Sequence, residues 1–338
     1  MMKPSTEPSH GEPPCTPLAV VAIGRNEGER LRRCLTSAMN SADLVVYVDS
    51  GSTDGSVELA KSLNAKVLVL DTNQPFTAAR ARNEGLGKAV EEMPQLQWVQ
   101  FVDGDCEIVP GWLDQAKQFL VSTPAAAAVF GRRRERYPEQ SVYNRMCDIE
   151  WGVQPGVVKY CGGDVMFRYE AIRGVDGYRE DLIAGEEPEL CVRLRAKNWT
   201  IHCISGEMTK HDAAMMRFSQ WWRRTVRCGY AYAEGVRLHG RPPERHWVRP
   251  LRSALAWGAA LPGIIIAGML SFGFWFVLLA LLYPLQVMRL SLKEKGSWTI
   301  RIQSAFYLLL GKFPEAQGAL RHWRHVLTKR RSQIIEYK

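Results

Sequence analysis

The sequence has no C-x-x-C pair among its eight cysteines, no internal repeat, and no apolar segment within its first 16 residues. The scattered cysteines argue against a structural zinc site and provide no disulfide framework, so we expect reduced thiols in a cytoplasmic setting. Residues 1–16 are rich in Pro, Ser, Glu and Gly, which predicts a flexible tail and not a signal peptide. With 338 residues and 46% hydrophobic content, the chain has room for a catalytic domain and an appendage.

Positive charge is in excess only in the C-terminal part of the chain. From residue 241 onward there are 15 Lys and Arg against 4 Asp and Glu, whereas the part before it has 29 against 31. A nucleic-acid-binding protein is expected to carry its basic residues in a groove of the folded domain. Here the excess flanks the most apolar stretch of the chain, so we expect a membrane as partner and no nucleic acid.

That apolar stretch, residues 253–288, is free of charge over about 36 positions. It is too long for one ordinary span of about 20 residues and short for two full ones. Pro262, Gly273 and Pro284 favour a helical hairpin that crosses twice or dips in and returns; a single span and a buried soluble helix pair are the alternatives. Because basic residues flank both ends, we expect anchoring through residues 253–288 at the cytoplasmic face of the inner (plasma) membrane.

Short apolar runs alternate with amphipathic segments over the first hundred residues. The runs predict strands at residues 18–23, 44–48, 66–70 and 96–102, with helices at 29–40, 57–63 and 76–90 between them. The expected fold is α/β, a mostly parallel mixed sheet with helices on both faces, followed by C-terminal membrane helices. Ligands of such sheets bind beyond the carboxyl ends of the strands, where Asp49 and Asp103 fall.

The composition along the chain predicts four parts. They are a flexible tail (1–16), a catalytic domain (17–240), a membrane hairpin with basic flanks (241–298), and an interfacial amphipathic helix with a basic tail (299–338).

Two acidic motifs can supply chemistry. Asp103-Gly104-Asp105 follows a predicted strand and offers two hard carboxylates to a Mg²⁺ or Mn²⁺ ion that also binds a diphosphate. The same three residues can also form an ordinary turn. Glu186 and Glu187 begin a predicted helix, where a glutamate can act as a base or can simply stabilise the helix N-terminus.

Separated motifs, in the expected order, resemble those of family 2 glycosyltransferases, which have the GT-A nucleotide-diphospho-sugar transferase fold, over roughly residues 18–240. They are Arg25-Asn26-Glu27, Val48-Asp49-Ser50-Gly51, Arg82-Asn83, Asp103-Gly104-Asp105, Cys161-Gly162-Gly163-Asp164 and Gly185-Glu186-Glu187-Pro188-Glu189-Leu190. Ser50 stands where the family usually has a second acid. Glu187 stands where it usually has an aspartate.

The resemblance implies a role for each matching residue. Donor contacts are implied for Arg25, Asn26, Glu27, Asp49, Ser50, Arg82, Asp103, Gly162, Gly163 and Asp164. Glu187 is implied as the catalytic base, with Glu186 beside it. Asp103, Asp105 and His211 are implied as ligands of a divalent cation, Mg²⁺ or Mn²⁺.

A further segment, Gln220-Trp221-Trp222-Arg223-Arg224, resembles the Gln-x-x-Arg-Trp element of processive members, with Arg224 in place of the final tryptophan. We therefore expect Gln220, Trp221, Trp222 and Arg223 on the acceptor side of the site. The tryptophans can stack on an acceptor sugar or lie at a membrane interface. A half-buried helix with solvated arginines is an equally good interpretation.

Together these features predict an inverting, metal-dependent glycosyltransferase of the hexosyltransferase class. It would move a sugar from a nucleotide-diphosphate donor to a lipid-linked or membrane-proximal saccharide acceptor, in envelope polysaccharide or glycolipid assembly. A polyprenyl-phosphate glycosyltransferase is an alternative, distinguished by a sugar phosphate ester as product. An alternative of another class is a catalytically lapsed, membrane-anchored scaffold that binds nucleotide sugars, which the retained acids at 103, 105, 186 and 187 argue against.

Overall fold

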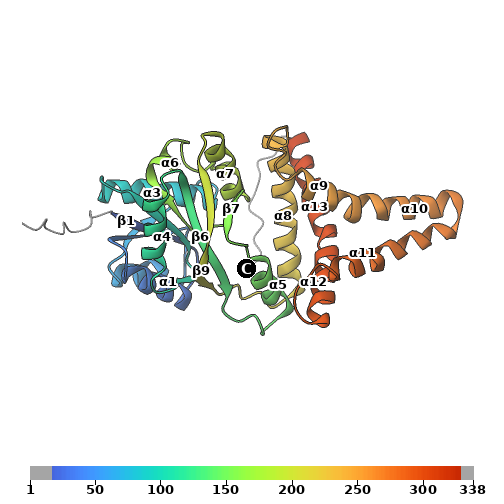
Figure 1. Cartoon of the computed structure of the whole chain (residues 1–338), viewed down its shortest axis with the longest axis horizontal. Coiled ribbons are helices and arrows are strands. Elements are labelled where there is room, and N and C mark those ends of the chain that lie inside the picture. The colour runs from blue at the N-terminus through green and yellow to red at the C-terminus, as the bar shows by residue number, and fades with distance from the viewer. Residues whose placement is uncertain (1–16, 329–338) are drawn as a thin grey trace, which may run out of the picture.

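The computed structural model describes residues 17–328 (Figure 1). The expected flexible tail (1–16) and the last ten residues of the expected basic tail (329–338) lie outside the described residues. The strands are β1 (Leu18–Gly24), β2 (Leu44–Asp49), β3 (Lys66–Val69), β4 (Trp98–Asp103), β5 (Cys106–Ile108), β6 (Ala126–Glu135), β7 (Gly156–Val158), β8 (Val165–Arg168) and β9 (Thr200–His211). The helices before residue 240 are α1 (Glu29–Met39), α2 (Ser56–Ser62), α3 (Ala78–Glu92), α4 (Trp112–Ser122), α5 (Val142–Glu150), α6 (Tyr169–Arg173), α7 (Glu186–Ala196) and α8 (Phe218–His239).

Within residues 17–328, all nine strands form one mixed sheet in the order β3-β2-β1-β4-β8-β6-β9-β5, with β7 paired to β9. Strands β3, β2, β1 and β4 are parallel, while β8 runs antiparallel to both of its neighbours. The predicted α/β class with a mostly parallel first half is confirmed, and its strand boundaries move by one or two residues. Strands β5 to β9 are additions that the sequence analysis did not predict.

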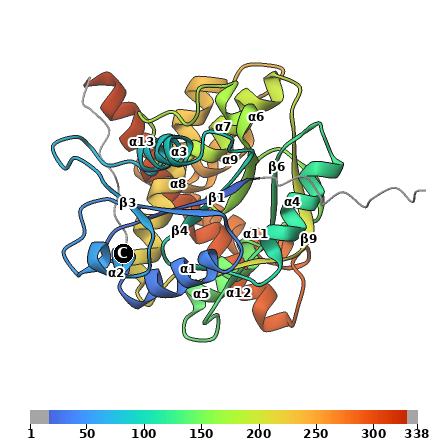
Figure 2. The same cartoon turned by 90° about the vertical axis from the view of Figure 1, so that its left-hand side faces the viewer.

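The central strands are buried on both faces because they consist of continuous apolar, β-branched runs. Residues 18–22 of β1 are at most 1% exposed. Helix α3 covers one face of β1 and β2, and α1 covers the other (Figure 2). The carboxyl ends of β1, β2 and β4 are in register, with Gly24 opposite Asp49 and Ile23 opposite Asp103. These strand ends form the edge on which the candidate site is built.

The chain after residue 240 leaves the body and then returns to it (Figure 1). It forms α9 (Val248–Leu255), a π-helical turn (Ala256–Ala260), α10 (Leu261–Phe272), a 3₁₀ segment (Phe274–Leu281), α11 (Leu282–Ser291), α12 (Trp298–Leu310) and α13 (Lys312–Leu327). Helix α13 packs along α8 (Figure 1). The two backbones meet at Gly229, where an added Cβ would overlap the backbone of Glu315. The contacts between α8 and α13 therefore join the parts of the chain on either side of the expected domain boundary at residue 240.

Helices α10 and α11 project from the body as a hairpin (Figure 1). Two continuous helical stretches, Val248–Phe272 and Phe274–Ser291, are long and apolar enough to cross a membrane by length and composition, and only 6% of the most apolar part of each is buried inside the protein. The residues at the tip are largely exposed: Phe272 is 78%, Phe274 70% and Trp275 79% exposed. Large apolar side chains are rarely exposed this densely on a soluble surface.

Candidate functional site

Two loops at the ends of β1 and β2 are tied together by their polar side chains. The Asn26 carboxamide accepts a hydrogen bond from the Thr53 amide at 2.8 Å, and the Asn26 amide donates to the Ser52 hydroxyl at 2.9 Å. Asn26 has a positive φ of 56°, a conformation that asparagine tolerates better than most residues. The loops that carry five of the predicted donor-binding residues, 25–27 and 49–50, therefore form one unit.

Asp49 holds the second of these loops in shape. Its carboxylate accepts the amides of Gly51 and Ser52 at 2.9 and 2.8 Å and the Tyr47 hydroxyl at 3.0 Å, and the residue is 1% exposed. In this structure the side chain orders the turn. Arg25 lies outside it, with its guanidinium 5.6 Å from the ring centroid of Phe76. An arginine and an aromatic ring at the mouth of a strand-end loop form a surface on which a planar base can stack.

Arg82, on α3, joins the two acidic motifs. Its guanidinium lies 2.9 Å from Oδ1 of Asp103, 3.0 Å from Oε1 of Glu186 and 2.7 Å from Oε1 of Glu187. Only 3% of its side chain is exposed. Burial acts to lower the pKa of Arg82, but the Glu187 and Asp103 carboxylates outweigh it and the pKa is raised. Segments about 20 and 100 residues away from Arg82 in the chain thus converge on one buried cation.

The pKa of Glu187, at the start of α7, is also raised. Helix α7 begins after Gly185, which has a φ of 81°, so both glutamates lie in its first turn. Burial and repulsion from the Glu186 carboxylate raise the pKa of Glu187 to about 7, although Arg82 acts in the opposite direction. A carboxyl group with a pKa near neutrality can accept a proton and release it at physiological pH.

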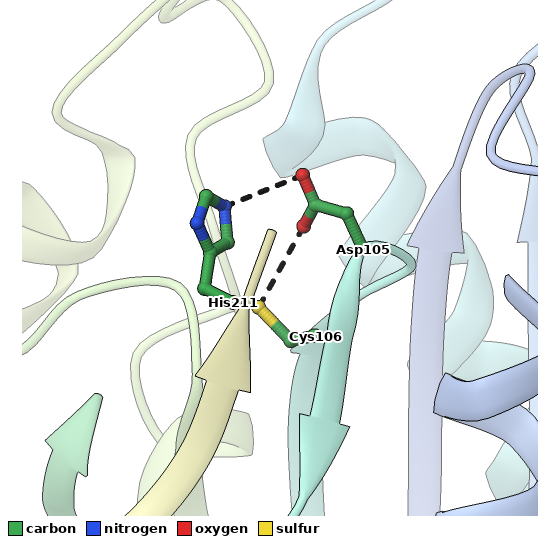
Figure 3. Close-up of side chains that lie close together, drawn as sticks. All are labelled: Asp105, Cys106 and His211. Carbon is green, nitrogen blue, oxygen red and sulfur yellow. Dashed lines mark hydrogen bonds and ion pairs between the residues drawn. The ribbon is translucent and has the colours of Figure 1, made fainter. Parts of the chain in front are cut away.

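Asp105 and His211 come together at the end of β9, 106 residues apart in the chain (Figure 3). Nε2 of His211 lies 3.3 Å from Oδ2 of Asp105, and the Cys106 thiol lies 3.6 Å from Oδ1 of Asp105. These three side chains have potential ligand atoms within 4.8 Å of one another. The oxygen and imidazole nitrogen suit Mn²⁺ or Mg²⁺, whereas a thiol suits softer metals than these two. Burial and the nearby Asp164 raise the pKa of the Cys106 thiol well above its usual value.

Asp103 has different surroundings from Asp105. Besides Arg82, it lies 3.4 Å from Nη2 of Arg133, and Arg133 lies 2.8 Å from Oδ1 of Asp164. Asp164 also accepts the Asp103 amide and the Thr209 hydroxyl, at 3.1 and 2.6 Å. Asp103, Cys106 and Asp164 form a second group with potential ligand atoms close together. The structure therefore brings all three predicted metal ligands to one region, but only Asp105 contacts His211 directly.

The glycine loop approaches the same cluster. A Cβ on Gly163 would lie 2.5 Å from Nη2 of Arg82 and 3.1 Å from Oδ2 of Asp103, so the close approach requires glycine. Gly162 has open space in the direction of its missing Cβ.

Residues 220–223 have structural contacts at the start of α8. The Gln220 carboxamide accepts the amides of Met216 and Arg217 and caps the helix. Trp221 is 6% exposed and stacks on Tyr143, and the Trp222 indole donates to Gln317. Arg223 donates to the Ser219 carbonyl within the helix. These contacts match the half-buried helix interpretation, and the acceptor role of the four residues stays a prediction.

Two residues of the site were not anticipated from the sequence. Arg133 and Glu135 lie in β6, within a run of charged residues that resembles a solvated surface. Arg133 bridges Asp103 and Asp164, and Glu135 contacts His211. A weak signal was present, since the charged residues 132–135 follow the buried apolar run 126–130 and form the carboxyl end of β6, the end of a strand at which ligands of such sheets bind.

Residues 20–171 match the family model described as Glycosyl transferase family 2. An uncharacterized glycosyltransferase of Rickettsia bellii (strain RML369-C) is 31% identical over 105 residues, which are 31% of this chain and 33% of the relative. Glycosyltransferase AglE of Haloferax volcanii is 28% identical over 116 residues, 31% of this chain and 36% of the relative. The matches span about a third of the length of these curated relatives.

Among solved structures, the mannosyltransferase PcManGT from Pyrobaculum calidifontis, in complex with GDP-Man and Mn²⁺, is similar with a TM-score of 0.60. It is 19% identical, and the match covers 90% of this chain and 86% of that one. At this identity the likeness shows a shared fold.

Proposed function

We propose that this chain is an inverting enzyme that moves a sugar from a nucleotide-diphosphate donor to a membrane-associated acceptor. The match of residues 20–171 to the model of glycosyl transferase family 2 and the GT-A fold support this proposal. The single observation that carries the proposal is the cluster around Arg82. It places a carboxyl group with a pKa near 7, Glu187, next to the Asp103 loop at the carboxyl edge of the sheet.

Glu187 is the proposed catalytic base. It takes a proton from the acceptor hydroxyl as that oxygen forms its bond to the anomeric carbon, while the bond from that carbon to the donor diphosphate breaks. The oxygen attacks from the face opposite the leaving group, which inverts the configuration. Glu186 keeps the pKa of Glu187 high by repulsion, and Arg82 holds the carboxylate in place.

The donor is proposed to lie across the ends of β1, β2 and β4. The tied loops at 25–27 and 49–53 border the base and ribose, with Arg25 beside Phe76 as a stacking surface. The glycines of the 161–164 loop leave room for the diphosphate and sugar close to Asp103. Arg82, expected as a donor contact, is proposed to act mainly by organising the carboxylates.

Asp105 and His211 fit a divalent cation, with Asp103 on the adjoining loop. When bound, Mn²⁺ or Mg²⁺ would neutralise the charge of the leaving diphosphate. The similar PcManGT was solved with GDP-Man and Mn²⁺, so GDP-mannose and Mn²⁺ are the first donor and cation to test.

The acceptor is proposed to be lipid-linked or membrane-proximal, because the exposed hairpin gives the protein a surface for a bilayer. Basic residues at the base of the hairpin, including Arg249, Arg252 and Lys293, are exposed and suit anionic head groups at the cytoplasmic face. Helix α12 adds an apolar stripe at four-residue spacing, with Trp298, Ile302 and Phe306 between 37% and 48% exposed. This spacing puts the three side chains on one face, as in an interfacial helix.

The test is the variant Glu187→Gln, assayed for sugar transfer from GDP-mannose and UDP-glucose to membrane lipid extracts and for donor binding by calorimetry. Loss of a general base costs about 10²–10⁴-fold in turnover, whereas donor binding should stay within about twofold because the variant keeps the size of the side chain. Glu170→Gln, at an exposed position on α6, is the matched control. Unchanged turnover in Glu187→Gln would remove Glu187 from the proposed mechanism.

A further inference from the structure

His211 lies between two carboxylates, and only one of them belongs to the sequence motifs. Its Nε2 faces Oδ2 of Asp105 at 3.3 Å, and its Nδ1 faces Oε2 of Glu135 at 3.5 Å. The Glu135 side chain is fully buried, and those of Asp105 and His211 are 4% and 8% exposed. Both ring nitrogens therefore have an acidic partner in a site that is almost closed to solvent.

The register of the sheet fixes this arrangement. In the parallel pair β6–β9, Glu135 is directly opposite His211, and on the other side of β9, Cys106 of β5 is opposite the same residue. Side chains at paired positions of neighbouring strands point to the same face of a sheet. Glu135 is consequently held beside His211 by the backbone ladder, independently of any bound ligand.

The Glu135 carboxylate is held by four donors. Oε2 accepts the Ala213 amide at 3.1 Å in addition to His211, and Oε1 accepts the Tyr137 amide at 3.2 Å and Nδ2 of Asn144 at 3.3 Å. Asn144 is itself fixed, since its carboxamide oxygen accepts the Met215 amide. Donors on both oxygens leave the carboxylate little freedom to rotate.

The ring of His211 is also confined by packing. The Trp151 ring meets it edge to face, with centroids 4.7 Å apart, and the Arg133 guanidinium lies 5.4 Å from the Trp151 centroid. Rotation of the imidazole is thereby restricted, and each ring nitrogen keeps its partner.

From these contacts we infer that Glu135 is a positioning residue for the metal centre: it accepts the Nδ1–H of His211 and so directs the Nε2 lone pair toward the cation position beside Asp105. A neutral imidazole carries one N–H, and a hydrogen bond to one nitrogen decides which nitrogen is available to a metal. Carboxylates behind metal-binding histidines commonly act in this way. The inference rests on the proposed metal role of Asp105 and His211.

The test is the affinity for Mn²⁺ alone, measured by an electron paramagnetic resonance titration, in wild type, Glu135→Gln and Glu207→Gln. Each oxygen of Glu135 faces two donors. A glutamine at this position has only one oxygen, so its NH₂ group must face two of the four donors and cannot accept their hydrogen bonds. We expect Glu135→Gln to weaken Mn²⁺ binding about 10–100-fold. Glu207, on the same strand as His211, is a matched control with a side chain that is 45% exposed, and Glu207→Gln should bind Mn²⁺ as wild type does.

The variant His211→Ala separates the inference from the proposed function. If Glu135 acts through His211, then Glu135→Gln should cause no additional loss of Mn²⁺ affinity in the His211→Ala background. Wild-type affinity in His211→Ala would overturn the metal site itself. Weakened binding in His211→Ala together with unchanged binding in Glu135→Gln would overturn only the role of Glu135.

A measurement on the wild-type protein covers the case in which Glu135→Gln does not fold. Nitrogen-15 NMR of labelled histidines reports which ring nitrogen carries the proton, and the His211 signals are identified by their loss in His211→Gln. With Mg²⁺ bound, we expect the proton of His211 on Nδ1. A proton on Nε2 would overturn the inference.

Discussion

Arg82 and Glu187 form a buried ion pair, with 2.7 Å between Nη1 and Oε1. The same guanidinium holds Glu186 and Asp103, so one cation connects the start of α7 to the end of β4. The catalytic arrangement that we propose depends on Arg82, although Arg82 acts on the reacting atoms only through the carboxylates that it binds.

Replacing Arg82 with methionine should therefore destabilise the fold as well as the site. The change leaves three carboxylates without their shared partner, and removal of one member of a buried ion pair costs about 3–5 kcal/mol. The measurement is denaturant unfolding of the detergent-solubilised protein. Arg32→Met, which removes an exposed pair with Glu29, should change stability by less than about 1 kcal/mol. Equal stabilities of the two variants would contradict the structural role of Arg82.

The pH dependence of turnover should report the ionisation of Glu187. The base is active when ionised, and its pKa is raised to about 7 by burial and by Glu186. We expect kcat/KM to rise with pH through about 7 and then to level off. A rising limb centred near pH 4.5, the ordinary pKa of a glutamate, would show that the base is exposed or is another residue.

The variant Glu186→Gln should shift the pH profile of kcat/KM to lower pH. The Glu186 carboxylate raises the pKa of Glu187 by repulsion, so its neutralisation should lower that pKa and shift the rising limb of kcat/KM to lower pH. The measurement is the pH profile of the variant beside that of wild type. A limb that stays in place, or moves upward, would contradict the assigned electrostatic coupling.

Asp105→Asn and Asp103→Asn should differ in their effect on metal binding. Asp105 contacts His211, whereas Asp103 is engaged by Arg82 and Arg133. Asp105→Asn should weaken Mn²⁺ binding by more than about 100-fold, beyond the usual range for an outer partner, and Asp103→Asn should weaken it less. Titration of the two variants with Mn²⁺ checks this order, and the reverse order would place the cation at the Asp103–Asp164 group instead.

Charged residues on the hairpin should release the protein from lipid. Ile264 and Leu278 are 54% and 55% exposed, and a charged residue deep in a bilayer costs about 3 kcal/mol. The double variant Ile264→Glu/Leu278→Glu should lose much of its flotation with anionic liposomes. Val121→Glu changes an equally exposed apolar residue on α4 (57%) and should float as wild type does. Unchanged flotation of the double variant would place the membrane contact elsewhere.

The sequence predicted the first half of the fold because β1, β2 and β4 are continuous apolar runs between amphipathic helices. Strands β5 and β7 were not predicted, since three residues are too few to show a period and their pairing with β9 depends on distant parts of the chain. The α/β class therefore followed from local pattern, whereas the second half of the sheet, β5 to β9, required the structure.

The site divides in the same way. Asp105, Glu187 and His211 lie in or near recognisable motifs, and all three are buried, Glu187 beside Arg82 and Asp105 beside His211. Glu135 could not be predicted, because its role comes from its pairing with His211 across the sheet, 76 residues away in the chain. The ion pairs of Arg82 could not be predicted for a similar reason, because its partners come from β4 and α7, which are distant in the chain.

The most direct test of the central claim is a calorimetric titration of the detergent-solubilised protein with GDP-mannose, UDP-glucose and TDP-glucose, in Mn²⁺ and again in EDTA. A metal-dependent nucleotide-sugar transferase should bind one of these donors in Mn²⁺ and lose that binding in EDTA and in Asp105→Asn. Absence of binding to all three donors in Mn²⁺, by a protein that is folded, would contradict the account.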